Sequence, residues 1–110
     1  MMVLDKKIAE QTVNYLTQIN AIKLNTKNPF TWTSGIKSPI YCDNRLILSY
    51  PDVRKFIADK MTDIVKNKYG ENISIAGVAT GAIAIGAMID ERLNLPYAYV
   101  RPEPEEHGLK

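Results

Sequence analysis

The segment 73–100 constrains the fold most, because two apolar stretches flank one helical stretch within it. Residues 73–78 (Ile-Ser-Ile-Ala-Gly-Val) are typical of a buried strand, and Thr80-Gly81 is typical of a tight turn. Residues 82–93 favour a helix, and residues 95–100 favour a second strand. Two strands joined through a helix are predicted to run parallel with a right-handed crossover. The segment therefore indicates an α/β fold.

Two more helical patterns precede this β-α-β unit. Residues 3–20 place apolar side chains near helical spacing, and a second helix is predicted to open at 49–52 and to end at Gly70. Short strands are expected within 21–24 and 38–43. A chain of 110 residues can bury one modest core. Two parallel strands alone bury too little apolar surface for a finished domain, so we expect the N-terminal segment or a partner chain to complete it.

Composition argues against several classes of function. The net charge is only +2 and no Lys/Arg run occurs, so nucleic-acid binding is not predicted. One cysteine and one histidine exclude an internal disulfide and argue against a metal site held by the protein itself. No apolar stretch approaches 18 residues, and the N-terminus does not resemble a signal peptide. We therefore expect a cytoplasmic protein with no membrane partner.

The run 30–45 is dense in side chains that can bind a ligand. It reads Phe-Thr-Trp-Thr-Ser-Gly-Ile-Lys-Ser-Pro-Ile-Tyr-Cys-Asp-Asn-Arg. Its aromatic faces offer contact area, Lys37 and Arg45 offer charge, and its hydroxyls offer hydrogen bonds that suit a flat, anionic small molecule. The hydroxyls belong to Thr31, Thr33, Ser34 and Ser38. The alternative is an ordinary hairpin that turns at Ser34-Gly35, with half-buried aromatic residues at Trp32 and Tyr41.

The turn 77–82 (Gly-Val-Ala-Thr-Gly-Ala) joins the carboxyl end of a predicted strand to the N-terminus of a predicted helix. Free backbone N–H groups and the helix dipole favour a phosphate at such a place. The spacing matches neither G-x-x-x-x-G-K-[ST] nor G-x-G-x-x-G, so ATP and dinucleotides are not predicted. Close packing of the strand on the helix explains the small residues equally well.

Three stretches together resemble the orotate phosphoribosyltransferase family. They are the run 30–45, the turn 77–82, and Arg101 followed by His107-Gly108. The resemblance covers the whole chain in order and spacing, and it covers the first half of the family. It implies an α/β fold that is the first part of a type I phosphoribosyltransferase domain, incomplete within 1–110. An N-terminal helix and an orotate-binding hood would occupy 1–50, and the first half of the α/β core, ending in the catalytic loop, would occupy 51–110.

The resemblance implies a glycosyltransferase that joins orotate to 5-phosphoribosyl 1-pyrophosphate. The products would be orotidine 5′-monophosphate and pyrophosphate, in pyrimidine (UMP) biosynthesis, with Mg²⁺ carried on the diphosphate and a homodimer as the assembly. The orotate-binding residues would be Thr33, Lys37, Tyr41, Asp43 and Arg45. The pyrophosphate-binding residues would be Ala79, Thr80, Gly81, Ala82, Arg101 and His107, of which Arg101 and His107 would also be catalytic.

The chain departs from the family pattern at several positions. Glu105 stands where the family has a lysine, and a carboxylate there would oppose the negative charge that develops on departing pyrophosphate. Thr80 and Gly81 stand where many members carry an aromatic residue and a lysine. Cys42 replaces an aromatic residue, and we expect it to be a small buried hydrophobe, since no base is near it in sequence.

The family's ribose-phosphate signature, an apolar strand ending in paired acids before Thr-Gly-Gly, does not occur in the 110 residues. The chain alone is therefore expected to be inactive. Two alternatives stay open. One is a phosphoribosyltransferase for a purine or for uracil, against which the run 30–45 argues. The other is a non-catalytic ligand-binding or regulatory remnant, which Glu105 and the missing signature favour.

Overall fold

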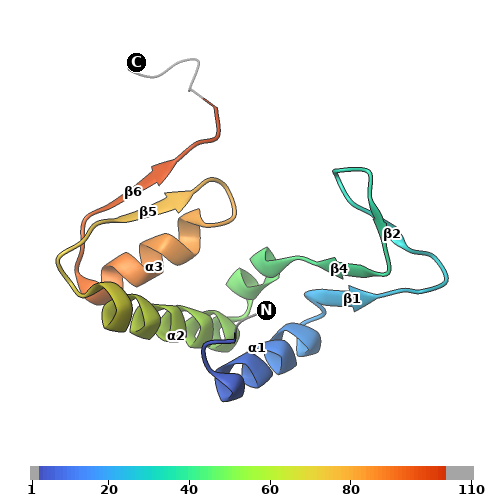
Figure 1. Ribbon diagram of the computed structural model, residues 1–110, viewed down its shortest axis with the longest axis horizontal. Helices are drawn as coiled ribbons and strands as arrows, with labels where there is room; N and C mark the ends of the chain where they lie inside the picture. Colours follow the sequence, from blue (N-terminus) through green and yellow to red (C-terminus); the bar gives the residue numbers. More distant parts are fainter. Residues whose placement is uncertain (1–2, 104–110) are drawn as a thin grey trace. The chain divides into compact units, whose positions relative to one another are not determined.

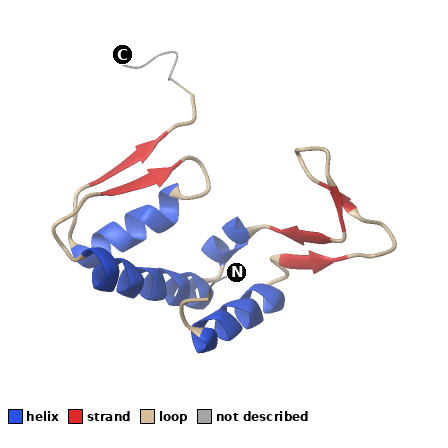
Figure 2. Cartoon of the chain, in the orientation of Figure 1, coloured by secondary structure: helices blue, strands red, loops and turns tan. Residues whose placement is uncertain are grey.

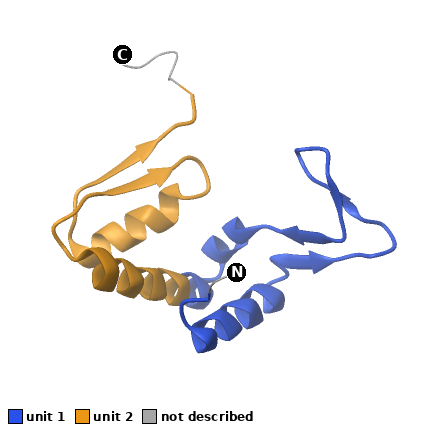
Figure 3. Cartoon of the chain, in the orientation of Figure 1, with its two compact units in different colours: residues 1–54 blue, residues 55–110 orange. Residues whose placement is uncertain are grey.

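The computed structural model describes residues 3–103, and the chain divides into two compact units, residues 1–54 and 55–110 (Figure 3). The elements of the first unit are α1 (Lys6–Gln18), β1 (Ile22–Leu24), β2 (Phe30–Thr31), β3 (Lys37–Ser38), β4 (Ile40–Cys42) and the 3₁₀ helix η1 (Asn44–Ser49) (Figure 1). Helix α2 (Pro51–Tyr69) begins at the end of this unit and leads into the second. There it is followed by β5 (Ile75–Val78), α3 (Ile83–Leu93) and β6 (Tyr97–Val100).

Helix α1 and strand β1 lie where the sequence pattern predicts them. The Asp5 carboxylate caps the helix by accepting a hydrogen bond from the Ile8 amide at 3.1 Å. The helix ends at Gln18 with Ile19 as its C-cap, and Asn20 follows with a φ of +59°, the left-handed conformation that asparagine tolerates better than most residues. Ala21 is almost fully buried at 1% exposure, and β1 then pairs antiparallel with β4. Strand β1 therefore follows α1 after a short connection and lies beside the later strand β4.

Strands β2 and β3 form the hairpin that was the alternative interpretation of the run 30–45. Their register pairs Phe30 with Ser38, and the Trp32 amide donates to the Ile36 carbonyl at 2.8 Å. Gly35 occupies the turn with φ +89°, a conformation that disfavours any residue with a side chain. Trp32 and Tyr41 nevertheless keep 41% and 36% of their surface exposed. The hairpin is therefore present, and both Trp32, within it, and Tyr41, on the adjoining strand β4, are exposed to solvent.

The β5–α3–β6 unit is parallel, as predicted. The register runs from Ile75 opposite Tyr97 to Val78 opposite Val100. Helix α3 lies along one face of this strand pair (Figure 2) and ends at Asn94 in the left-handed conformation, with φ 54°. Within residues 3–103 this sheet has two strands, and Val78 and Val100 are 59% and 52% exposed. Within the described residues this strand pair therefore leaves apolar side chains exposed, and the incompleteness of the domain stays a prediction.

Helix α2 begins at a proline, which suits a first helical turn, and Gly70 follows its last residue with φ +77°. Among the apolar residues of α2, Val53 and Ala58 are buried, whereas Met61 is 42% exposed, so these residues are core only in part. Arg92 of α3 binds Asp59 of α2 at 2.7 Å. None of the helices within 3–103 has both the length and the apolarity that crossing a bilayer requires.

Gly86 gives a stability prediction for α3. A Cβ at this buried position would lie 2.8 Å from Cε1 of Tyr97, closer than packed atoms approach. Gly86→Ala should lower the free energy of unfolding by about 1–3 kcal/mol through overpacking, despite alanine's better helix propensity. Urea denaturation measures the effect. Gly81→Ala is the control because a Cβ there meets nothing within 4 Å. Equal losses at both positions would contradict the packing account.

Candidate functional site

The hood, defined as residues 30–45, carries an open pocket of about 560 Å³. Its lining residues are Trp32, Thr33, Ser34, Ile40, Tyr41 and Cys42. The Trp32 indole N–H donates to the Ile40 carbonyl at 3.0 Å, which ties the hairpin to β4. The Tyr41 ring packs against Phe30, with centroids 5.7 Å apart and planes tilted by 39°. Aromatic surface and hydroxyl groups thus share one concave surface whose indole and phenol rings have fixed partners.

Two of the five residues predicted to bind orotate, Thr33 and Tyr41, lie together in this pocket. The other three, Lys37, Asp43 and Arg45, do not line it. Lys37 belongs to β3, opposite Thr31 in the hairpin register. The structure therefore places the predicted aromatic and hydroxyl groups in the pocket and the predicted charges on neighbouring parts of the hood.

Asp43 and Arg45 bind each other through two parallel hydrogen bonds. The guanidinium Nε lies 3.0 Å from Oδ1, and Nη2 lies 3.1 Å from Oδ2. The same carboxylate accepts from the Arg45 amide at 3.1 Å and so caps η1. The Arg45 side chain stays 66% exposed, and exposed pairs add little stability. We conclude that this bidentate pair mainly fixes the orientation of the guanidinium group.

The Asp43 pair yields a pH prediction. The hydrogen bond from Arg45 holds the pKa of Asp43 below its ordinary value, although desolvation opposes this. A carboxyl group whose pKa is lowered by folding stabilises the fold at pH values above its ordinary pKa. This contribution is lost as the pH falls through the pKa of the folded state. Carbon NMR of the Asp43 carboxyl should therefore give a titration midpoint below that of an unpaired aspartate, and Arg45→Ala should raise it. A midpoint unmoved by Arg45→Ala would contradict the pairing.

The expectation that Cys42 is a small buried hydrophobe is wrong. It is exposed, not buried, and its Sγ lies 3.2 Å from Oδ1 of Asn44. The reason is that β4 belongs to a two-stranded sheet, so Cys42 lines the open hood pocket and lacks cover. The five residues assigned to orotate did not include Trp32, Ser34 and Ile40, which also line the pocket, although the Ser34 hydroxyl was named among the groups of the run that suit a ligand. Trp32 could have been predicted as a site residue, since it is the single tryptophan of the chain and lies in the predicted ligand-binding run.

A second pocket, of about 370 Å³, lies at the carboxyl ends of β5 and β6. Its lining residues are Ala79, Thr80, Ile83, Tyr99, Arg101, Pro102 and Glu103. It brings together three residues of the predicted pyrophosphate site: Ala79, Thr80 and Arg101. Gly81 and Ala82 belong to the same turn but do not line the pocket. His107, Gly108 and Glu105 lie outside the described residues.

The backbone of the turn leaves two donors for a ligand. The Ala79 amide donates to the Val100 carbonyl at 2.7 Å, and the Ala82 amide donates to the Val78 carbonyl at 3.1 Å. The peptide between Ala79 and Thr80 is cis. Within residues 3–103 we find no acceptor for the amides of Thr80 and Gly81, and the space over Gly81 is open. These two N–H groups are therefore the ones that can bind an anion.

The second pocket, called the turn pocket below, contains side chains of both charges. Arg101 supplies a cation where the predicted phosphate would bind, and the carboxylate of Glu103 lies in the same lining. Sequence reasoning missed Glu103, Ile83 and Tyr99. The strand period could have found Tyr99, because alternate residues of a strand share one face and Tyr99 precedes Arg101 by two positions.

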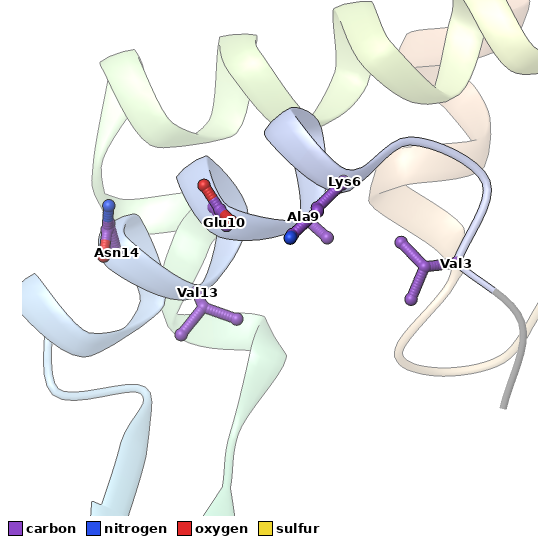
Figure 4. A pocket seen from close by; sticks show the side chains of 6 residues that line it. All are labelled: Val3, Lys6, Ala9, Glu10, Val13 and Asn14. Carbon is purple, nitrogen blue, oxygen red and sulfur yellow. The ribbon is translucent and has the colours of Figure 1, made fainter.

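A third pocket, of about 640 Å³, runs along α1 and holds none of the predicted site residues (Figure 4). Its lining is Val3, Lys6, Ala9, Glu10, Val13 and Asn14. Lys6 and Glu10 are four residues apart on the helix, so their opposite charges offset each other. This surface lacks the excess positive charge expected of an anion site.

Comparison with known proteins shows strong similarity to orotate phosphoribosyltransferases, although no protein-family model matches the chain. The orotate phosphoribosyltransferase of Phocaeicola vulgatus is 54% identical over 110 residues, which are 100% of this chain and 50% of that protein. The chain is homologous to orotate phosphoribosyltransferases. It spans about half the length of the curated orotate phosphoribosyltransferases that it matches. The family resemblance predicted from the sequence is thereby confirmed.

Solved structures confirm the predicted fold. The crystal structure of orotate phosphoribosyltransferase from Aeropyrum pernix has a TM-score of 0.69 and 31% identity, and the match covers 88% of this chain and 53% of that one. The adenine phosphoribosyl transferase of Trypanosoma brucei has a TM-score of 0.63 at 20% identity, covering 99% of this chain and 43% of that one. The second likeness shows the fold alone. The chain, a homologue of orotate phosphoribosyltransferases, has the first part of the type I phosphoribosyltransferase fold.

Proposed function

We propose that the chain is part of an orotate phosphoribosyltransferase, which joins orotate to 5-phosphoribosyl 1-pyrophosphate and gives orotidine 5′-monophosphate and pyrophosphate for UMP biosynthesis. The observation that carries the proposal is 54% identity along all 110 residues to a relative of that name. Because the match covers the whole chain, it includes both the hood and the turn. The adenine enzyme shares the fold, so the choice of base rests on the hood and not on the architecture.

In this proposal the hood holds orotate. The exposed rings of Trp32 and Tyr41 offer faces to a flat pyrimidine, and Thr33 offers a hydroxyl beside them. The orotate carboxylate needs a cation, which Lys37 or Arg45 would provide from the neighbouring hood surface. Nε and Nη2 of Arg45 bind Asp43, but its side chain is 66% exposed, so an incoming carboxylate can still reach it.

The turn would hold the diphosphate of the second substrate. The amides of Thr80 and Gly81 and the guanidinium of Arg101 would bind its oxygens. N1 of orotate gives up its proton to water and attacks the anomeric carbon of the ribose, while the bond from that carbon to the pyrophosphate oxygen breaks. The enzyme supplies position and neutralises the charge on the departing group. His107, which the resemblance adds to this site, lies outside the described residues.

Mg²⁺ would enter with the substrate. Its ligands would be the diphosphate oxygens, since Mg²⁺ prefers oxygen ligands and often binds through substrate phosphates. Among the residues that the structure describes, no group of three or more His, Cys, Asp or Glu could hold a metal ion. The ion would neutralise part of the diphosphate charge. We also propose a homodimer in the cytoplasm, by analogy with the family. Sedimentation of a complete protein would test the assembly.

Arg45→Ala tests the hood directly. Orotate binding should weaken by about 1.5–3 kcal/mol, the usual contribution of a hydrogen bond to a charged group. Calorimetry measures the change. Arg92→Ala is a matched control, since Arg92 also pairs with an aspartate, Asp59, at 2.7 Å but lies on α3. Unchanged orotate affinity in Arg45→Ala would remove Arg45 from the site, and equal losses in both variants would point to a general effect of lost charge.

A further inference from the structure

The side chain of Tyr97 reaches from β6 to the first turn of α3. Its hydroxyl donates a hydrogen bond of 2.7 Å to the carbonyl of Ile83, the first residue of that helix. Ile83 also lines the turn pocket, together with Ala79 and Thr80. The start of α3 is therefore held by a side chain from the neighbouring strand as well as by its own backbone.

Two glycines make room for the Tyr97 ring. A Cβ on Gly77 of β5 would overlap the Tyr97 hydroxyl and would lie 2.7 Å from the Ala82 carbonyl oxygen. A Cβ on Gly86 of α3 would lie 2.8 Å from ring atom Cε1. Both glycines are buried. The ring thus fills a slot that exists only because these two positions lack side chains, and it sets the distance between β5 and α3 beneath the turn.

We propose that Tyr97 is a positioning residue for the pyrophosphate turn. The inference rests on the proposed function. The turn runs from the end of β5 to the start of α3, and Tyr97 packs against the glycine on each element and bonds to the helix start. With both ends of the turn held, the amides of Thr80 and Gly81 are kept in place before the ligand arrives. Groups fixed in advance bind more tightly because less order must be created on binding.

Tyr97→Phe isolates the hydroxyl, because the ring that fills the slot is kept. NMR titration with Mg²⁺-pyrophosphate uses a chimera in which the chain replaces the matching half of the Phocaeicola vulgatus relative. The Thr80 and Gly81 amides should shift both with and without the Tyr97→Phe substitution. The dissociation constant should rise roughly 3- to 10-fold in the variant, the effect of one lost hydrogen bond. Orotate affinity should be unchanged, since the hood belongs to the other unit. Tyr69→Phe removes an equivalent hydroxyl from a ring that is 62% exposed and should change neither constant.

Gly86→Ala offers a second route to the same effect, since it pushes the same ring. Gly86→Ala should also lower the affinity for pyrophosphate. Because both changes act through the Tyr97 ring, the double variant should lose less binding free energy than the sum of the two single losses. Equal pyrophosphate affinity in wild type and Tyr97→Phe would overturn the inference and leave the proposed function standing. A parallel loss of orotate and pyrophosphate affinity would assign Tyr97 to general stability and also overturn it. Failure of the wild-type turn amides to respond at all would overturn both proposals.

Discussion

Orotate absorbance should stay constant when the 110-residue chain is mixed with orotate, 5-phosphoribosyl 1-pyrophosphate and Mg²⁺. It should fall steadily when the chain replaces the matching half of the Phocaeicola vulgatus relative in a chimera. The reason is that the chain spans 50% of that relative and has no acidic pair followed by Thr-Gly-Gly to hold the ribose phosphate. Enzymes of this kind accelerate reactions by at least about 10⁶-fold, so the gain in the chimera should be large.

The unaltered relative is the positive control for this assay, and uracil and adenine replace orotate as controls for the base. Turnover by the 110-residue chain in proportion to its concentration would contradict the expectation that it is inactive alone. Consumption of uracil or adenine in preference to orotate would favour a different base. A folded chimera that consumes none of the bases would favour a non-catalytic, ligand-binding role.

Glu105→Lys in that chimera should raise kcat by about 30- to 1000-fold, equivalent to roughly 2–4 kcal/mol. Glu105 lies outside the described residues, so the prediction rests on the sequence, in which Glu105 occupies the position of a family lysine. A cation stabilises the negative charge on departing pyrophosphate, and a carboxylate opposes it. Because that charge develops as the bond breaks, kcat should change more than orotate affinity. Steady-state kinetics with both substrates varied measures the two effects.

Glu105→Gln separates relief of repulsion from gain of attraction. Glu71→Lys makes the same change of charge at an exposed position that pairs only loosely with Lys66, at 3.7 Å, and should leave kcat unchanged. If Glu, Gln and Lys at position 105 gave the same kcat, the loop would not take part in the chemistry. The assignment of Arg101 and His107 as catalytic would then be withdrawn.

The sequence predicted the backbone well because each element carries its own local signal. The β5–α3–β6 unit follows from apolar stretches of strand and helix length on either side of a turn. Gly70 marks the end of α2 because its φ of +77° suits glycine. The hairpin and the ligand surface seemed to be alternatives in the sequence. They coexist, because the two-stranded β2–β3 hairpin leaves Trp32 exposed and the two-stranded β1–β4 sheet leaves Tyr41 exposed.

Side-chain partners could not be predicted in the same way. The period of a strand or helix shows which face a residue occupies, but not which atom it meets. Asp43 and Arg45 are both plausible ligand residues in the sequence, and only the geometry shows them bound to each other at 3.0 Å. The Tyr97 slot depends on two glycines, nine positions apart, that belong to different elements. Such contacts depend on the register between elements, which no single local pattern contains.

The most direct test of the account follows the indole N–H of Trp32 by NMR during titration of the chain with orotate. Trp32 is the single tryptophan, it lines the hood pocket, and its N–H donates to the Ile40 carbonyl, so one unique signal reports on the proposed base site. We expect a saturable shift with orotate and a much weaker response to uracil, which lacks the carboxylate. An indole signal that stays unmoved while calorimetry shows orotate binding, or that responds equally to uracil, would contradict the proposal that the hood recognises orotate.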